Sequence, residues 1–364
     1  MHLSITPLDT VFFRDGKAFT MGEETQADGL FPPPPAVLRG ALRTRYFTEH
    51  PDELRHAATE NDPTAETRIT GMGLRNSDTG MTYFPVPRDL VHRKDAEKES
   101  EMVLARPVKS SPRFVDSSTL EAPLTHPATV ESPGDAYLES LDLEHYLSSA
   151  KVQKASFWVT KQHDLVQSEP KIGIMRNRDT GGAQEGHLYR VGFRRLKQDI
   201  AFAVKVDGLK LDKSGLLKLG GEHKAAYYET VDSSWPLPKV PVSSIEETEC
   251  LRLYLATPAL FQQGWLPSWV DPDTHEAHLG GCRLKLYSAA VGKPSFIGGW
   301  NMKKRRPKPM RKAVPSGSVY YFKLTDGSVD DLVQQVHGQS ISDYRTRDGF
   351  GICYVGVAPP PKAG

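Results

Sequence analysis

The residue run with the clearest chemical signal is Gly298–Lys312, in which two glycines and a tryptophan precede a dense group of cations. Seven of the ten residues 303–312 are basic and none is acidic: Lys303, Lys304, Arg305, Arg306, Lys308, Arg311 and Lys312. Phosphates would supply the missing counter-charge and release condensed counterions. Gly298 and Gly299 permit a close backbone approach, and Trp300 can stack on a base. The run predicts a nucleic-acid contact; a solvated basic loop is the alternative.

Two further segments carry weaker signals of the same kind. Gly349 and Gly351 precede an apolar strand and could expose backbone amides to a phosphate, although an ordinary glycine turn has the same composition. Arg176 opens a polar, glycine-rich stretch that ends at Gly182, and more cations follow it: Arg190, Arg194, Arg195 and Lys197. The stretch predicts a protruding hairpin over 172–191, which lies either on RNA or on a protein.

Catalytic signatures are missing from the sequence. It contains no phosphate-binding Gly-x4-Gly-Lys loop, no His-Glu-x-x-His, no Cys-x-x-Cys pair and no Gly-x-Ser-x-Gly. Ser148–Lys151 fits Ser-x-x-Lys, as many surface helices do. The candidate general bases His163, His187 and His337 have no recognisable partner. A metal set is conceivable in Asp271, Asp273, His275, His278 and Cys282, but a polar loop is favoured. We expect no catalysis, no metal and no cofactor.

Composition bounds the class of protein. The chain has 364 residues, 46 basic against 45 acidic and 38% apolar, which excludes global disorder and favours two domains. The longest clean apolar runs, such as 200–204, fall far short of the roughly 18 residues of a membrane span, and the N-terminus does not resemble a signal peptide. Cys250, Cys282 and Cys353 suit a reducing cytoplasm. Glycines and prolines cluster between periodic segments, as in ordered loops.

The elements that must position these residues divide into two halves. In the first half, alternation predicts strands over 3–13, 68–72, 81–86, 154–160 and 199–206, and helical spacing predicts a helix over 35–47 with Arg39 and Arg43 off its apolar stripe. Residues 92–150 read as an insertion with one helix over 136–147, and 207–249 read as a linker.

The second half has a more regular pattern. Strands are predicted over 250–256, 281–290, 317–324 and 351–357, with helices over 259–269 and 329–337. This β-α-β-β-α-β order is the ferredoxin-like unit. The fold class is therefore α+β.

Three segments together resemble one known family. They are Ile5–Lys17 with Leu30–Arg43, Lys293–Tyr320, and Gly349-Phe350-Gly351. These residues are similar to the third subunit of the type III-B CRISPR effector, the Cmr complex, in the RAMP superfamily. The Pro7-Leu8-Asp9 to Arg14-Asp15-Gly16 opening is specific to that family, whereas glycine-rich strand ends are shared across RAMP proteins.

The resemblance implies two ferredoxin-like (RRM-like) domains, over 1–215 and 216–364, with long insertions and a glycine-rich loop. It implies a cytoplasmic, non-catalytic antiviral subunit that holds the 5′ tag of the CRISPR RNA. This subunit links the large polymerase-like subunit to the backbone subunits and meets target RNA only indirectly. The implied RNA-binding residues are Arg39, Gly40, Arg43, Arg176, Gly298, Gly299, Trp300, Lys303, Lys304, Arg305, Arg306, Lys308, Arg311, Gly349 and Gly351.

Two other functions remain open. A RAMP-type endoribonuclease would use a histidine as general base, but 35–47 and 347–356 contain none. A pure protein scaffold leaves the charge at 303–312 unexplained. The near-zero net charge argues against nucleic-acid binding only if charge is spread evenly, and acids at 95–101 and 246–249 offset some of the cations.

Overall fold

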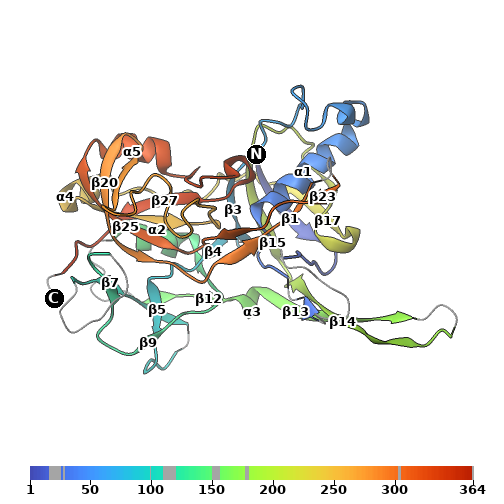
Figure 1. The fold of residues 1–364 in the computed structure, drawn as a ribbon, viewed down its shortest axis with the longest axis horizontal. Helices are drawn as coiled ribbons and strands as arrows, with labels where there is room; N and C mark the ends of the chain where they lie inside the picture. Colours follow the sequence, from blue (N-terminus) through green and yellow to red (C-terminus); the bar gives the residue numbers. More distant parts are fainter. Residues whose placement is uncertain are drawn as a thin grey trace.

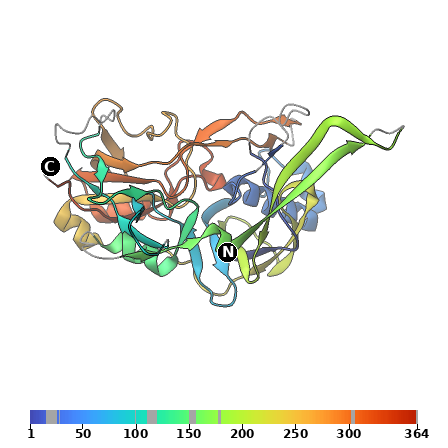
Figure 2. The ribbon, with the colours of Figure 1, turned by 90° about the horizontal axis from the view of Figure 1, so that it is seen from below.

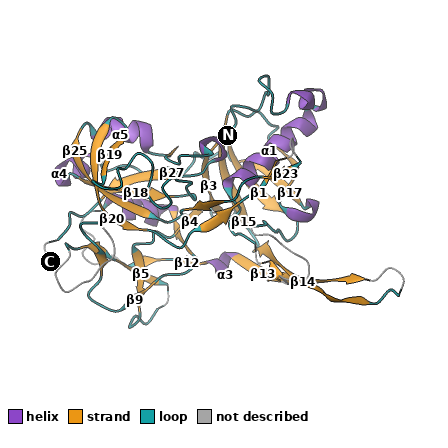
Figure 3. Ribbon diagram, in the orientation of Figure 1, coloured by secondary structure: helices purple, strands orange, loops and turns teal. Residues whose placement is uncertain are grey.

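The protein is a mixed α/β molecule built mostly of strands with few helices, as the computed structural model shows (Figure 3). The structure describes residues 1–15, 26–27, 29–98, 100–109, 120–149, 156–176, 180–301 and 305–362. None of the helices within these ranges has the length and apolar character needed to cross a bilayer. Cys250, Cys282 and Cys353 are free and buried.

An antiparallel eight-stranded sheet organises the first half (Figure 1). From edge to edge its strands are β12 (Thr160–Lys161), β10 (Ala136–Glu139), β4 (Thr82–Pro85), β3 (Arg68–Asn76), β15 (Ile200–Asp207), β1 (His2–Pro7), β17 (Ala225–Thr230) and β16 (Ser214–Lys218). Helix α1 (Pro35–Glu49) begins with a proline at its first position, as predicted, and buries its apolar stripe, which includes Leu38 and Leu42.

The sequence predictions for the first half need several corrections. The first strand ends at Pro7 rather than at residue 13, and β15 lies between β1 and β3. The predicted helix over 136–147 begins as β10, which pairs with β4 and extends the sheet, and only then becomes α2 (Ser140–Ser148). The predicted linker 207–249 contains β16, β17 and α4 (Val242–Thr248). Tertiary pairing overrides local periodicity at these sites.

The insertion is ordered over the residues that the structure describes. It forms a small sheet in the order β11 (Phe157–Trp158), β6 (Glu101–Leu104), β5 (Leu90–Arg93) and β9 (Val130–Glu131). A two-stranded pair joins β7 (Arg106–Pro107) to β8 (Leu124–Thr125). The predicted strand over 154–160 becomes β11 and β12, with its first two residues outside the described part.

A long two-stranded arm leaves the body (Figure 2). Its strands are β13 (Val166–Arg176), which follows the one-turn helix α3 (Gln162–Leu165), and β14 (Ala183–Leu196). The predicted hairpin is therefore confirmed and is longer than expected. Short β2 (Gln26–Ala27) pairs in parallel with Arg190 and Val191 and supports the base of the arm. Ile172 and Ile174 are exposed, at 68% and 51%.

The second half forms a six-stranded antiparallel sheet. Its order is β19 (Glu276–Leu279), β20 (Cys282–Ala290), β25 (Val319–Asp326), β18 (Cys250–Leu255), β27 (Ile352–Val357) and β26 (Gln339–Ser340). The predicted helix over 329–337 is α5 (Val329–Val336), which is capped by the Ser328 hydroxyl. The predicted helix over 259–269 is wrong, because this segment is a loop that contains Gly264 and Pro267. The amides of Gln262 and Ser268 in this loop donate to Asp343.

Four strands of each sheet follow the same spatial order. In the first sheet the order is β3, β15, β1 and β17, and in the second it is β20, β25, β18 and β27. In both, the first strand along the chain lies between the third and the fourth, and the second lies beyond the third. The chain passes from one sheet to the other between Thr230 and Cys250, so a boundary at 215/216 falls inside β16.

The two sheets share one hydrophobic core. Alternate residues of β18 face opposite ways: Leu251 and Leu253 pack with the outer core of the second half, whereas Cys250 and Tyr254 join the core of the first half. The second sheet is therefore buried on both faces, which explains its continuous apolar strands. The Tyr254 hydroxyl donates to the Pro85 carbonyl at 2.6 Å and ties the halves together.

A buried charge cluster lies in this shared core. Arg252 and Asp89 are fully buried, with Nη1 and Oδ2 3.7 Å apart. The Tyr146 and Tyr321 hydroxyls both donate to Asp89 Oδ2, at 2.6 Å for Tyr146. Arg252 also donates to the Val357 carbonyl at 2.7 Å, and its guanidinium lies 4.2 Å from the Tyr146 ring centroid. Burial raises the pKa of Asp89, an effect that Arg252 and the two hydroxyls oppose.

Breaking this cluster should destabilise the whole chain. We expect Asp89→Asn and Arg252→Met each to cost about 3–5 kcal/mol in the free energy of unfolding, because either change leaves the other group buried without its counterpart. The Asp89→Asn/Arg252→Met double variant should lose much less than the sum, as measured by urea denaturation. Glu66→Gln, at an exposed ion pair with Arg68, is the control and should cost under ~1 kcal/mol. Additive losses in the double variant would contradict the coupling.

Candidate nucleic-acid interface

Three of the predicted RNA-binding segments meet along one seam between the halves. They are α1, the basic segment 298–312, and the loop 345–351, which contains the 3-10 turn η3 (Thr346–Asp348). Arg39 Nη1 of α1 lies 3.2 Å from Asp348 Oδ1. Arg345 Nη1 donates to the Gly298 carbonyl at 3.4 Å. Residues that are about 300 positions apart in the sequence thus form one surface.

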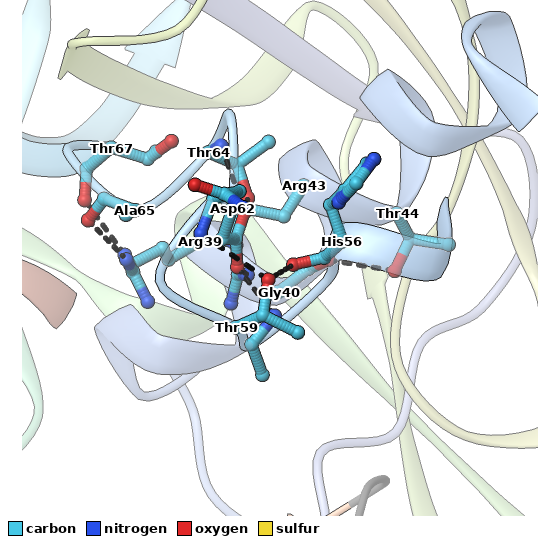
Figure 4. Close-up of polar contacts among 12 residues, drawn as sticks. Arg39, Gly40, Arg43, Thr44, His56, Thr59, Asp62, Thr64, Ala65 and Thr67 are labelled. Atoms are coloured by element: carbon cyan, nitrogen blue, oxygen red, sulfur yellow. Dashed lines mark hydrogen bonds and ion pairs between the residues drawn. The ribbon is translucent and has the colours of Figure 1, made fainter. Parts of the chain in front are cut away.

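Arg39 is held from several sides within this seam. Its Nε donates to the Thr67 carbonyl at 2.8 Å and its Nη2 to the Ala65 carbonyl at 3.4 Å (Figure 4). Its side chain is 14% exposed, and burial lowers its pKa, although Asp348 opposes this effect. Asp348 also accepts from Arg345 Nε at 2.7 Å. One carboxylate therefore contacts two guanidiniums and can offset at most one of their two positive charges.

Arg43 is fixed in the same way one helical turn further on. It contacts Asp62 at 2.5 Å and the Thr64 hydroxyl at 2.6 Å (Figure 4). Burial alone would raise the pKa of Asp62, but donors from Thr64 and Ala58 and the Arg43 charge outweigh it and lower that pKa. Gly40, between the two arginines, is exposed, and a Cβ built there would meet no atom within 4 Å.

The basic segment forms a hairpin. Strand β21 (Ser295–Ile297) pairs with β24 (Arg311–Ala313), and β22 (Trp300–Asn301) pairs with β23 (Arg306–Pro307). We call residues 295–313 the basic hairpin. Buried Ile297 and Ala313 anchor it on Leu260 and Phe350. Lys303 and Lys304 lie outside the described residues.

The described cations of the basic hairpin point to solvent. Arg305, Arg306, Lys308, Arg311 and Lys312 are exposed, and within the described part of the chain none has an acidic partner within 4.0 Å. Arg311 lies 3.8 Å from the Tyr344 ring centroid. Trp300 is 54% exposed, so its ring is available for stacking. Gly299 has φ +133 and lies across the turn from Lys308, whose amide donates to its carbonyl.

Lys308 of the basic hairpin interacts electrostatically with the other two segments of the seam. Although the residue as a whole is exposed, desolvation and then the neighbouring Arg345 lower its pKa, and Arg39 and Arg43 act in the same direction. Asp348 opposes them. Lys308 and three arginines therefore repel one another where the basic hairpin meets the rest of the seam. Asp348 cancels only part of this repulsion.

The glycines of the loop 345–351 serve packing. A Cβ on Gly349 (φ +94) would lie 2.7 Å from Cβ of Ile69, and one on Gly351 (φ +71) would lie 2.8 Å from Ser342. Both glycines are buried, and their amides donate to the Thr346 and Pro258 carbonyls. The expectation that these amides are exposed to a phosphate is wrong, because the Gly349 amide closes the turn of η3 and the Gly351 amide pairs with Pro258.

Other predicted residues fall outside the seam. Arg176 is the last residue of β13, on the arm, and the structure does not describe its side chain. Conversely, the predicted site omitted Arg345, Asp348 and Asp62, which orient the arginines. The only local signal for the first two was the alternation of charges in Arg345-Thr346-Arg347-Asp348.

Two of the groups considered for catalysis or metal binding, Asp271 and His337, have structural roles. No cluster of three or more His, Cys, Asp and Glu able to hold a metal occurs among the described residues. Asp271 Oδ1 instead accepts from Asp273 and Thr274 within a turn. Both ring nitrogens of His337 are engaged, by the Pro238 carbonyl and the Val355 amide, and burial lowers its pKa.

The packing role of Gly349 can be tested by one substitution with a matched control. Gly349→Ala should destabilise the chain by about 2 kcal/mol more than Gly264→Ala, because overpacking against Ile69 adds to the strain of a positive φ. Gly264 has a similar φ of +80 but open space around it. Urea denaturation measures both. Equal losses would mean that backbone strain alone explains Gly349.

Comparison with known proteins identifies the family of the chain. A family model described as "CRISPR-associated protein (Cas_Cmr3)" matches residues 3–358. No curated protein matches the chain. One similar solved chain comes from "Cryo-EM structure of the Type III-B Cmr-beta bound to cognate target RNA", with a TM-score of 0.53, 17% identity, and coverage of 88% of this chain and 86% of the other.

Two further solved structures are more distant. A chain of the same complex bound to target RNA and AMPPnP has a TM-score of 0.49, 18% identity, and the same coverage of 88% and 86%. A chain of "Csm3-Csm4 subcomplex in the type III-A CRISPR-Cas interference complex" has a TM-score of 0.39 and 11% identity over 99% of both chains. The family match covers both sheets and the seam between them, and it confirms the resemblance seen in the sequence. The chain belongs to the Cmr3 family of CRISPR-associated proteins.

Proposed function

We propose that the chain is a non-catalytic RNA-binding subunit of a type III-B CRISPR effector complex. In this proposal it holds the 5′ tag of the CRISPR RNA on the seam and links the large polymerase-like subunit to the backbone subunits. The observation that carries the proposal is the unpaired charge of the basic hairpin beside α1. Membership of the Cmr3 family supports the assignment to such a complex.

The distribution of charge favours an external phosphate partner. The acids at the seam are already engaged, since Asp62 contacts Arg43 and Asp348 contacts both Arg39 and Arg345. The exposed cations of the basic hairpin therefore have no protein acid left to neutralise them in the described seam. Binding of RNA phosphates would relieve the repulsion that Arg345, Arg39 and Arg43 exert on Lys308, which adds to desolvation in lowering its pKa, and it would release counterions.

Gly40 supports an RNA path along α1. A glycine inside a helix costs roughly 0.5–1 kcal/mol relative to alanine, and no packing contact explains Gly40 because its Cα faces open space. Removing the side chain lets a ligand backbone approach the helix between Arg39 and Arg43. Both arginines are fixed by their acids, so they form a rigid edge for that path.

The common strand order supports two ferredoxin-like units. The order β3-β15-β1-β17 and the order β20-β25-β18-β27 both match the antiparallel arrangement of that unit. One helix of the pattern is present in each half, α1 in the first and α5 in the second. We propose that the loop 256–275 and strand β16 replace the two missing helices.

RNA binding by the basic hairpin can be measured from its salt dependence. The purified full chain should bind a short RNA that carries the 5′ tag, and Arg306→Gln and Lys312→Gln should each weaken binding at all tag sequences. Each should also flatten the slope of log affinity against log salt by about 0.7, the contribution of one phosphate on a single strand. Filter binding at several salt concentrations gives both quantities.

A matched control separates a local contact from net charge. Lys323→Gln on β25 removes one exposed cation that already contacts Glu249, and it should leave the slope unchanged. Charge reversal at Arg305, Arg306 and Lys312 together, without loss of affinity, would refute RNA binding by the basic hairpin. Cleavage of the RNA by the wild-type chain without any metal would refute the non-catalytic role.

The linking role can be tested on the arm. An isolated two-stranded ribbon is marginally stable, and Ile172 and Ile174 are exposed, so a protein partner is expected to cover it. Replacing 174–188 by a tight turn that joins the paired residues Gly173 and Tyr189 keeps the arm base and its contact with β2. Recovery of partner subunits in the reconstituted complex should fall while RNA affinity is retained. Loss of RNA affinity alone would instead assign the arm to RNA.

A further inference from the structure

A pocket of about 240 Å³ lies on the seam next to the basic hairpin. Both halves line it: Pro33 precedes α1, Tyr137 belongs to β10, Thr257 follows β18, and Ile297 belongs to the basic hairpin. Most of the lining is apolar, with several prolines. Arg88 and Asp135 supply its charged side chains, and Gln162 supplies an amide.

Arg88 is held in this pocket without a partner. Its Nε is buried and donates to no acceptor. Among the described residues, its guanidinium forms neither a hydrogen bond nor an ion pair. Burial lowers its pKa, and Asp135 opposes that effect from beyond ion-pair distance. A desolvated donor group without an acceptor costs free energy, so its retention calls for an explanation.

Two glycines lie close to the Arg88 side chain. A Cβ on Gly292 would lie 2.4 Å from Arg88 Cζ, and one on Gly317 would lie 3.6 Å from its Cγ. The Arg88 amide also donates to the Gly317 carbonyl at 2.9 Å. The absence of a side chain at Gly292 therefore leaves room for the Arg88 guanidinium at this place in the pocket wall.

We propose that this pocket accepts one nucleobase of the bound RNA, flipped out of the strand, with Arg88 donating to an acceptor on its edge. The inference rests on the proposed RNA-binding function and extends it to a base-reading subsite. Single-stranded RNA is read in this way, by bases splayed into pockets and bonded along their edges. Asp135 and Gln162 can serve the donor groups on the same edge.

The chemistry of the pocket favours a base over other occupants. Its volume is below the 300–1,000 Å³ typical of sites for drug-sized ligands, so a single ring system suits it. Arg88 and Asp135 carry opposite charges, which removes the net attraction that a phosphate or carboxylate needs. Ile297 and Ser295 of the basic hairpin form part of the wall, so a strand bound there passes the pocket.

Abasic scanning combined with Arg88→Met tests the proposal. A set of tag RNAs, each with one abasic position, is titrated onto the full chain. We expect one position to lose about tenfold in affinity, within the range for one buried base, and Arg88→Met to lose a similar factor on intact RNA. On the RNA that is abasic at this position, Arg88→Met should have no further effect. Ser316→Trp, which adds a large side chain to the pocket lining, should reproduce the loss if Arg88→Met fails to fold.

The controls distinguish failure of the pocket from failure of RNA binding. Arg283→Gln on β20 removes an equal charge outside the pocket lining and should bind all the RNAs as the wild type does. Absence of RNA binding by the wild type would refute the proposed function itself. Uniform abasic effects, or additive losses with Arg88→Met, would refute the base pocket while leaving RNA binding intact. Loss of partner subunits by Arg88→Met without any change in RNA affinity would assign the pocket to a protein and overturn the proposal.

Discussion

The buried contact of Arg252 with Asp89 holds the two halves of the molecule in register. Asp89 belongs to the first half, just before β5, and Arg252 to the central strand of the second sheet. Two buried charges impose strong geometric demands, since each loses its solvation and must find the other group at a defined place. Tyr146 and Tyr321 complete the site from α2 and β25. The contacts of this cluster require one placement of the first half relative to the second. The geometry of the seam between the halves follows from that placement.

The pocket arginine and the contacts of the loop 345–351 both depend on how the two halves are placed. Arg88 precedes Asp89 directly, so the residue that enters the buried cluster also fixes the backbone that carries the pocket arginine. Asp348 can bridge Arg39 and Arg345 only if the loop 345–351 lies against α1, and Gly349 allows this loop to approach Ile69. The seam uses acids to fix its arginines, whereas the basic hairpin leaves its cations unpaired. A near-neutral chain can therefore present one basic face.

The sequence predicted the elements that local patterns determine, and it missed the features that depend on contacts distant in the sequence. Helix α1, strands β18 and β25, and the arm are set by local periodicity and turn composition, which the sequence displays directly. Gly349 and Gly351 were recognised, but their role depends on Ile69 and Ser342, which no local pattern connects to them. The segment 259–269 has helical spacing, yet its backbone bonds go to Asp343 and Val314. Such long-range partners decide packing and cannot be seen in a window of neighbouring residues.

The basic hairpin and the pocket would contribute different kinds of energy to the same complex. Phosphate contacts attract any strand and weaken with salt, and they give position without sequence information. A base seated beside Arg88 adds a contact that depends little on salt and fixes the register of the strand, because a slip by one nucleotide would present a different base. A subunit that must hold a defined end of an RNA needs both contributions. Charge alone would let the strand slide, and a single base contact would be too weak to retain it. Their proximity on one seam, ordered by one buried ion pair, is the physical basis for assigning both to one ligand.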